Sequence, residues 1–276
     1  MKKEAVLNYY IFNGKIYSTS DMTCFDHIID PMIYEVIRII DGKALFLEEH
    51  LERMRKSTRL LGCELHKSEK EIADEIYKLI EKNECKNMNV KLICSNLKNK
   101  EQDFLCYLIK SHYPEESLYE RGIHTILYYS ERENPNAKVI NTTLRESVNN
   151  TLKEENAFEA LLVNKEDFIT EGSRSNMFFL KGNTLYTAPA GDVLLGVTRD
   201  RIMKVCKNLN VIVIEECIDK KEIVNLDGAF MTGTSVNVLP IRTIGEVLID
   251  SVNNFWIQEI ANGYKKEVQE YLKKAR

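Results

Sequence analysis

The sequence predicts an α+β protein of two lobes. Strand-like and helix-like segments follow one another without the regular strand–helix–strand alternation that is typical of a parallel α/β sheet. The pairs Asn13-Gly14 and Asp41-Gly42 each separate two apolar runs and therefore predict tight β-hairpins. Residues 114–121 are polar and turn-rich, which indicates a connection between lobes. We therefore expect a smaller N-terminal domain at residues 1–117 and a larger C-terminal domain at residues 118–276.

The first lobe contains predicted strands and two amphipathic helices. Its strand-like segments are residues 6–12, 15–18, 34–40, 43–47, 90–94 and 103–110. Helices are predicted at residues 48–61 and 68–82, where apolar residues recur at helical spacing. Gly62 stands where the first helix should end. Ser68 and Glu71 have the spacing of a capping box, which marks the start of the second helix.

The second lobe has the same mixed character. Strands are predicted at residues 122–130, 160–164, 177–187, 211–215, 228–232 and 237–241. Helices are predicted at residues 143–155, 198–209 and 252–273. Within residues 177–187, Gly182-Asn183 separates two apolar runs and predicts a hairpin.

Composition and charge argue against several classes of function. The net charge is −4 and the basic residues are scattered, so the sequence has no nucleic-acid footprint. No apolar run approaches the roughly 20 residues that span a membrane, and the chain starts without a signal-peptide pattern. Seven cysteines without a Cys-x-x-Cys pair predict reduced, mostly buried thiols in a cytoplasmic protein. The five histidines lack metal-ligand spacing, so we expect no metal site.

Residues 170–199 carry the strongest chemical signal. Glu171 precedes Gly172 at a strand end, where a carboxylate can face a positively charged ring nitrogen; alternatively, the pair forms a surface turn. Val197 and Thr198 open a helix whose amides and hydroxyl can hold a phosphate, although an ordinary helix cap has the same sequence. A ring nitrogen and a phosphate are the two ends of pyridoxal phosphate. The stretch therefore suggests an enzyme that handles amino groups.

Five segments stand in an order that resembles the class IV aminotransferases, the fold-type IV pyridoxal phosphate enzymes. They are residues 34–38 (Tyr-Glu-Val-Ile-Arg), 46–53 (Phe-Leu-Glu-Glu-His-Leu-Glu-Arg), 170–176 (Thr-Glu-Gly-Ser-Arg-Ser-Asn), 196–199 (Gly-Val-Thr-Arg) and 230–240. The family includes branched-chain aminotransferases, D-amino acid aminotransferases and aminodeoxychorismate lyases. The resemblance implies a small N-terminal α/β domain and a larger C-terminal domain with a mixed, barrel-like sheet.

The resemblance also implies roles for individual residues. Lys138, in Ala137-Lys138-Val139-Ile140-Asn141, matches the lysine that forms a Schiff base with pyridoxal 5'-phosphate. Glu171 matches the acid that keeps the pyridine nitrogen protonated. The remaining cofactor-binding residues that the resemblance implies are Arg53, Val197, Thr198 and Thr234 around the phosphate and Tyr34 near the lysine.

Two segments depart from the family pattern. Residues 30–33 read Asp-Pro-Met-Ile where members usually have Gly-Asp-Gly, and residues 94–97 read Cys-Ser-Asn-Leu where an arginine often binds the substrate carboxylate. Arg174 is an unusual cation in the loop of small residues that follows Glu171. It could bind a substrate carboxylate through its fork of donors or point to solvent, and Tyr34 is a second candidate substrate contact.

The implied activity is amino-group transfer between an amino acid, branched-chain-like or of D configuration, and a 2-keto acid through the Lys138 Schiff base. Two alternatives stay open at this point: elimination of pyruvate, as in aminodeoxychorismate lyase, and a catalytically silent homologue that only binds the cofactor. The family also implies that the cofactor binds between the two lobes and that the chains pair as homodimers. We expect amino acids and 2-keto acids as ligands, with no nucleic acid and no membrane as partner.

Overall fold

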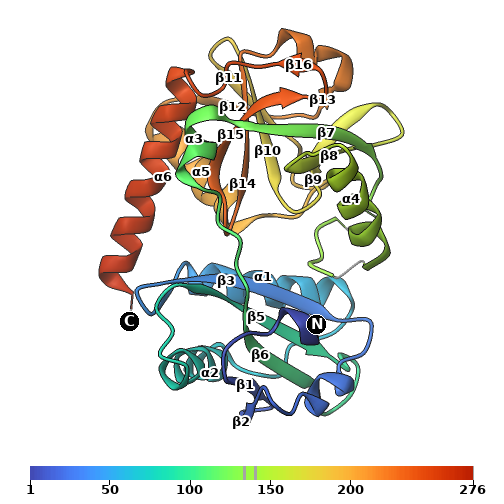
Figure 1. The fold of residues 1–276 in the computed structure, drawn as a ribbon, viewed down its shortest axis with the longest axis vertical. Helices are drawn as coiled ribbons and strands as arrows, with labels where there is room; N and C mark the ends of the chain where they lie inside the picture. Colours follow the sequence, from blue (N-terminus) through green and yellow to red (C-terminus); the bar gives the residue numbers. More distant parts are fainter. Residues whose placement is uncertain (133–134, 140–141, 276) are drawn as a thin grey trace. The chain divides into compact units, whose positions relative to one another are not determined.

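The computed structural model describes residues 1–132, 135–139 and 142–275, which form two compact units (Figure 1). Unit 1 comprises Met1–His112, Ala137–Ile140 and Val268–Arg276, and unit 2 comprises Tyr113–Asn136 and Asn141–Glu267. Each unit combines helices with a β-sheet, so the predicted α+β class is confirmed. The domain boundary predicted between residues 117 and 118 stays a prediction.

Unit 1 is built on a six-stranded sheet with the order β2-β1-β6-β5-β3-β4. Its strands are β1 (Tyr9–Phe12), β2 (Lys15–Ser18), β3 (Ile33–Ile40), β4 (Lys43–Ala44), β5 (Met88–Ser95) and β6 (Asp103–Ile109). Its helices are α1 (Leu47–Leu60) and α2 (Glu69–Lys82), with 3-10 helices at Lys2–Glu4 and Thr23–His27. Both predicted hairpins are present, because Asn13-Gly14 and Asp41-Gly42 take the left-handed φ angles that tight hairpin turns require.

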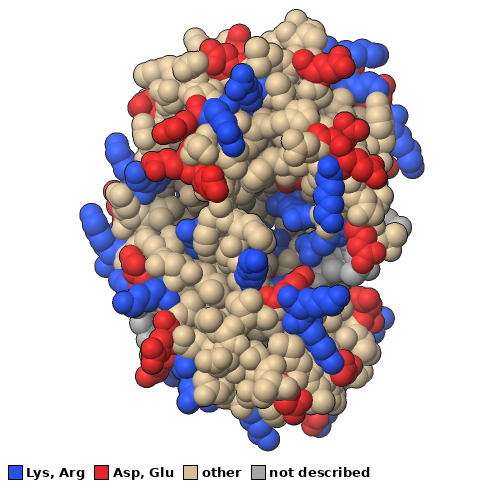
Figure 2. All heavy atoms as spheres, in the orientation of Figure 1, with Lys and Arg blue, Asp and Glu red and all other residues tan. Residues whose placement is uncertain are grey.

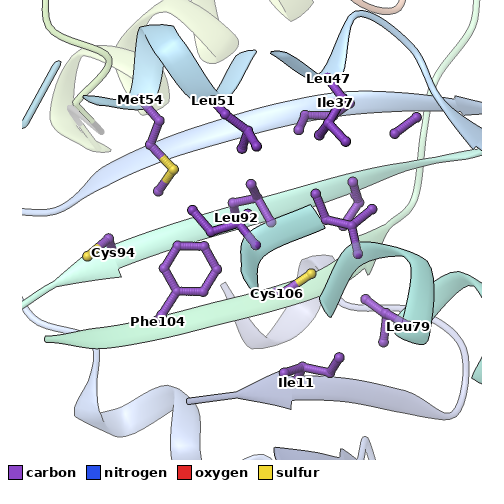
Figure 3. Close-up of a cluster of buried hydrophobic side chains, with 14 of the residues drawn as sticks. Ile11, Ile37, Leu47, Leu51, Met54, Leu79, Leu92, Cys94, Phe104 and Cys106 are labelled. Carbon is purple, nitrogen blue, oxygen red and sulfur yellow. The ribbon is translucent and has the colours of Figure 1, made fainter. Parts of the chain in front are cut away.

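β3 sends alternate side chains to two different cores. Ile37 packs with Leu51 of α1 on the helix-covered face, and Figure 3 shows this part of the core. Tyr34 packs on the opposite face, in the cluster that contains Tyr107. Because side chains alternate along a strand, Glu35 points to the same face as Ile37. Two adjacent residues of β3 therefore carry their functional groups to opposite faces of the sheet.

The two helices of unit 1 begin in different ways. α2 has the predicted capping box: Glu71 N–H donates to Ser68 Oγ at 3.2 Å, and Ser68 N–H donates to the Glu71 carboxylate at 2.8 Å. Before α1, Phe46 takes a left-handed φ of 51° and makes no side-chain cap. Instead, the N–H of Leu47 donates to the hydroxyl of Tyr271 at 2.9 Å. The start of α1 is therefore capped by a residue from the far end of the chain.

Unit 2 contains a ten-stranded sheet within the described residues, with the order β12-β11-β10-β14-β15-β7-β8-β9-β13 and with β16 paired to β15. Its strands are β7 (Ile123–Tyr129), β8 (Glu159–Val163), β9 (Phe168–Gly172), β10 (Asn176–Lys181), β11 (Thr184–Thr187), β12 (Ile212–Glu215), β13 (Ile218–Asp219), β14 (Gly228–Gly233), β15 (Asn237–Ile244) and β16 (Val247–Leu248). Its helices are α3 (Glu116–Arg121), α4 (Thr142–Glu154), α5 (Val197–Asn208) and α6 (Phe255–Lys274), with a 3-10 helix at Lys220–Asn225. Residues 268–274 of α6 belong to unit 1. The sheet is mixed, since β7 pairs in parallel with both β8 and β15.

One predicted connection is a helix. Residues 114–121 were expected to be irregular, but α3 forms there because Leu118 and Tyr119 pack against the core of unit 2. Gly122 ends this helix with a φ of 73°. A side chain at Gly122 would also lie 2.9 Å from Cβ of Arg242, so glycine is required there on two grounds.

Some strand predictions were wrong in extent. The strand expected at residues 6–12 begins only at Tyr9, because Leu7 takes a left-handed φ of 67°. The strand expected at residues 43–47 ends at Ala44, since the chain turns into α1. The strand end predicted at Glu171 is that of β9, whereas the short strands β13 and β16 were not predicted.

The surface carries charges of both signs. Figure 2 shows basic and acidic side chains interspersed over the face in view. In the part of the chain that the structure describes, no helix combines the length and the apolar character that a membrane crossing requires. All seven cysteines are unpaired, and four of them are buried.

Candidate functional site

Lys138 lies beside the start of β3 in unit 1. Tyr34 N–H donates to the carbonyl of Lys138 at 3.1 Å, and Lys138 N–H donates to Ser57 Oγ of α1 at 3.2 Å. Val139 forms an isolated bridge with Ile33. The Lys138 ammonium lies 4.7 Å from the centre of the Tyr34 ring. The backbone of this segment is thus fixed on both sides, which holds the amine near Tyr34. Ile140 and Asn141, the end of the predicted motif, lie outside the described residues.

Arg53 is held on α1 by Glu35 of β3. Its Nε and Nη2 donate to the two oxygens of the Glu35 carboxylate at 2.7 and 2.6 Å, and His50 Nδ1 lies 2.8 Å from the same carboxylate. All three side chains are buried. Burial opposes ionisation of Glu35, but the charge and hydrogen bonds of Arg53 outweigh it and lower the pKa of Glu35 to about 2. Burial lowers the pKa of His50, so its ring is neutral at pH 7.

A second buried cation, Lys91 of β5, lies on the Tyr34 face of the sheet. Its side chain is 3% exposed, and its ammonium lies 2.5 Å from the carboxylate of Glu4. The same ammonium lies 5.5 Å from the centre of the Tyr34 ring and 6.0 Å from that of Tyr107. Lys91 and Lys138 therefore place their ammonium groups within 6 Å of one tyrosine ring.

In unit 2, Glu171 is buried near the end of β9. One carboxylate oxygen accepts the N–H of Leu194 at 3.2 Å, and the other lies 3.0 Å from Nε of Arg132. Arg132 also donates from Nη2 to the carbonyl of Ser173 at 2.8 Å. These contacts fix the direction of the carboxylate and balance its charge.

The start of α5 lies in the same part of unit 2. Gly196 is the N-cap and supplies no side-chain cap. A Cβ at Gly196 would lie 2.2 Å from Oδ1 of Asn176, whose Nδ2 donates to the carbonyl of Leu194 at 2.8 Å. Leu194 is therefore bonded through its N–H to Glu171 and through its carbonyl to Asn176. The acid, Leu194 and Asn176 therefore form one hydrogen-bonded group, and Asn176 also lies against Gly196 at the helix start.

This helix start fits an anion. Val197 and Thr198 are buried, and the first amides of α5 have no side-chain acceptor at the N-cap. Thr232 of β14 pairs with Asn176 in the sheet, so the two side chains lie on the same face. The Thr232 hydroxyl is buried and has no hydrogen-bond partner among the described residues. Thr234 follows two residues later, half-buried in the turn after β14.

Arg174 occupies a different environment from the other predicted residues. It is exposed, and its guanidinium is hydrogen-bonded to Oδ1 of Asn149 on α4. Its predicted role in binding a substrate carboxylate stays a prediction. In unit 1, residues 94–97, where the family often has an arginine, belong to the interior: Cys94 and Ser95 are wholly buried, and the side chain of Asn96 bonds to Asp103.

Three charged residues, Glu35 and Lys91, which are buried, and Arg132, which is half-buried, were not among the predicted site residues. In the sequence, Glu35 was noted only as part of the motif at residues 34–38. His50 and Arg53 stand one helical turn apart, which could have suggested that they share an acidic partner. Arg132 falls between the strand predicted at residues 122–130 and the helix predicted at residues 143–155, where no element was predicted. Lys91 offered one signal, because it interrupts the apolar run of a buried strand.

Comparisons with known proteins give the family. The chain matches the family model described as Amino-transferase class IV over residues 32–244. It is 30% identical to a probable branched-chain-amino-acid aminotransferase of Rickettsia typhi, with 97% of each chain covered. It is 28% identical to D-alanine aminotransferase of Bacillus licheniformis, with 87% of this chain and 90% of that one covered.

A solved structure supports the same fold. The branched-chain aminotransferase from Thermoproteus uzoniensis with norvaline superposes with a TM-score of 0.85 at 18% identity, covering 98% of this chain and 99% of that chain. The two-lobed architecture implied by the sequence is thereby confirmed. The family model spans residues of both units. The chain belongs to the class IV aminotransferases.

Proposed function

We propose that this class IV aminotransferase uses Lys138 to bond pyridoxal phosphate covalently and Glu171 to face its pyridine nitrogen. The chain matches the class IV aminotransferases, and solved branched-chain aminotransferases of the same fold contain pyridoxal phosphate or pyridoxamine 5'-phosphate. The observation that carries the assignment is the hydrogen-bonded group of Glu171, Leu194 and Asn176, which lies against Gly196 at the uncapped start of α5. It joins a buried carboxylate to an anion-binding helix terminus, as the two ends of this cofactor require.

The donors present fit a phosphate. The amides of Val197 and Thr198 would hold its oxygens. The hydroxyl of Thr232, which has no hydrogen-bond partner among the described residues, offers a further donor beside the predicted Thr234. Arg53 would supply the positive charge, and its bidentate pair with Glu35 keeps the guanidinium in one orientation.

Bound pyridoxal phosphate supplies an electron-withdrawing ring that stabilises negative charge at the substrate α carbon. Lys138 would then carry the proton: Nζ would remove it from the α carbon of the amino acid that becomes the keto acid, and would later deliver a proton to the α carbon of the new amino acid formed from the second keto acid. Tyr34 keeps that amine in place through its ring and its backbone N–H. Glu171 keeps a proton on the ring nitrogen, and Arg132 orients the Glu171 carboxylate.

For the substrate carboxylate, Lys91 is the stronger candidate of two. Its ammonium is buried and shares the Tyr34 ring with Lys138, whereas Arg174 is exposed and bonded to Asn149. Glu4 is the present partner of Lys91 and is itself 41% exposed along its side chain. An incoming carboxylate could take the place of Glu4 on the same ammonium. The substrates would be an amino acid, branched-chain-like or of D configuration, and a 2-keto acid.

The same proposal includes a homodimer that works in the cytoplasm. Unpaired cysteines support a reducing compartment. Sedimentation of the purified protein at several concentrations would detect the dimer, and a monomer at all concentrations would contradict it.

The function is tested by incubating the purified protein with pyridoxal phosphate, a panel of L- and D-amino acids, and either 2-oxoglutarate or pyruvate. We expect a new amino acid to form from the keto acid, with Lys138→Ala inactive. Pyruvate release from aminodeoxychorismate without an acceptor would instead show the lyase reaction. A protein that binds no cofactor would contradict both.

A further inference from the structure

We propose that Glu159 is a positioning residue that holds Glu171 in its working orientation; this rests on the proposed role of Glu171. Glu159 is the first residue of β8 and is 3% exposed. It forms no ion pair with a lysine, arginine or histidine of the described residues. Burying a carboxylate without a cationic partner costs free energy unless hydrogen bonds satisfy its oxygens. The donors around Glu159 therefore indicate its role.

Neutral donors surround the Glu159 carboxylate. Ser173 donates to Oε1 twice, from its N–H at 3.2 Å and from its hydroxyl at 2.6 Å. The hydroxyl of Ser175 donates to Oε2 at 2.9 Å, and the N–H of Ala160 donates to Oε1 at 2.9 Å. Three of these four hydrogen bonds come from the loop that follows Glu171. The Glu159 carboxylate therefore helps to fix the conformation of that loop.

Residues 172–175 form a tight turn against the Glu159 carboxylate. Gly172 N–H donates to the carbonyl of Ser175 at 2.8 Å, which closes a four-residue turn. A Cβ at Gly172 would lie 2.0 Å from Ser175 Oγ and 3.2 Å from the Glu159 side chain. There is no space for a side chain between the turn and the carboxylate. Removing the carboxylate would take from the turn the three hydrogen bonds that Ser173 and Ser175 donate to it, and would leave the backbone bonds Gly172 N–H to Ser175 and Ser173 N–H to Ala160.

Ser173 connects Glu159 to Glu171 through Arg132. Its N–H and hydroxyl are bonded to Glu159, and its carbonyl accepts from Nη2 of Arg132 at 2.8 Å. Nε of the same guanidinium lies 3.0 Å from Oε1 of Glu171. The path Glu159–Ser173–Arg132–Glu171 is continuous and lies within unit 2. Loss of Glu159 should leave Glu171 in place but free to rotate away from the ring nitrogen.

The test compares wild-type holoprotein with Glu159→Ala and Glu159→Gln. We measure the dissociation constant for pyridoxal phosphate, the pH dependence of the visible absorption band of the cofactor, and Tm. Glu159→Ala should weaken cofactor binding about tenfold, the scale on which residues orienting a metal ligand act, and should shift the pH profile of the band. Glu159→Gln retains an acceptor for Ser173 and should largely restore both.

Ser251→Ala is the matched control for general loss of stability. Ser251 is wholly buried in unit 2, and its hydroxyl accepts the N–H of Ala229 at 2.9 Å. Its substitution should lower Tm without moving the pH profile or the cofactor affinity. If Glu159→Ala behaves in the same way, the positioning role is wrong. If Glu159→Ala does not fold, Ser173→Ala combined with Ser175→Ala removes two of the donors and should shift the pH profile in the same direction.

A double-mutant cycle separates this inference from the proposed function. If Glu159 acts through Glu171, Glu159→Ala should no longer shift the pH profile of the band in a Glu171→Gln background. Full additivity would overturn the positioning role while leaving the cofactor assignment intact. Wild-type protein that binds no pyridoxal phosphate would overturn the proposed function itself.

Discussion

Arg53 and Glu35 form a bidentate pair inside unit 1, with hydrogen bonds of 2.7 and 2.6 Å between the guanidinium and the two carboxylate oxygens. Breaking a buried pair leaves a charge without its partner. Glu35→Gln should therefore lower the free energy of unfolding by about 3 to 5 kcal/mol. Urea denaturation of the wild type and the variant measures this difference in the free energy of unfolding. The matched control is Glu52→Gln on α1, the helix that carries Arg53. The exposed ion pair between Glu52 and Lys56 should contribute less than about 0.5 kcal/mol to stability.

Acid should destabilise the protein in two steps. The folded-state pKa of His50 is lowered, so the unfolded chain takes up a proton first, and stability from this group is lost as pH falls below about 6.5. The pKa of Glu35 falls from 4.5 to about 2, so its contribution is complete above about pH 4.5 and is lost toward pH 2.

The size and origin of the second step can be checked. Lowering the pKa of Glu35 from 4.5 to about 2 corresponds to roughly 3 kcal/mol of free energy of unfolding. Unfolding free energies of wild type and Glu35→Gln, measured from pH 7 to pH 3, should converge as the pH falls below 4.5. Parallel curves over this range would contradict the assignment.

Lys91→Met tests the proposed substrate cation. A hydrogen bond to a charged group contributes about 1.5 to 3 kcal/mol, so KM for the keto acid should rise roughly ten- to a hundredfold, with a smaller change in kcat. Steady-state kinetics with 2-oxoglutarate or pyruvate give both constants. Lys82→Met is the control, because Lys82 also lies over a tyrosine ring, that of Tyr9, but is exposed. Equal effects of the two variants would rule out a specific role for Lys91.

Tyr271→Phe tests the cap on α1. The Tyr271 hydroxyl accepts from Leu47 N–H at 2.9 Å and donates to Glu48 at 2.6 Å. Losing a helix cap costs about 1 to 2 kcal/mol, so the urea midpoint should fall accordingly. Tyr128→Phe, which loses only an exposed hydrogen bond to Ser147, should change stability by less than about 0.5 kcal/mol. An unchanged midpoint for Tyr271→Phe would show that water caps the helix equally well.

The elements that the sequence predicted best have local causes. The capping box of Ser68 and Glu71 and the glycine turns of both hairpins depend on residues a few positions apart. α3 was missed because Leu118 and Tyr119 make it helical through contacts with a distant part of unit 2.

The same distinction applies to the candidate site. Glu171 and Val197 were named from motif order, since each stands at an element boundary that the sequence marks. Arg132 could not be found in this way, because its partner is far along the chain and its own segment has no periodicity. Glu159 is a comparable case: only the folded loop brings Ser173 onto its carboxylate.

The attachment of the cofactor to Lys138 is the central claim, and one measurement tests it directly. The protein is loaded with pyridoxal phosphate, reduced with sodium borohydride, digested and analysed by mass spectrometry. Reduction fixes the pyridoxyl group on whichever amine carried it. We predict the added mass on the peptide that contains Lys138, and only there. A pyridoxyl group on another lysine, or none at all, would contradict the account.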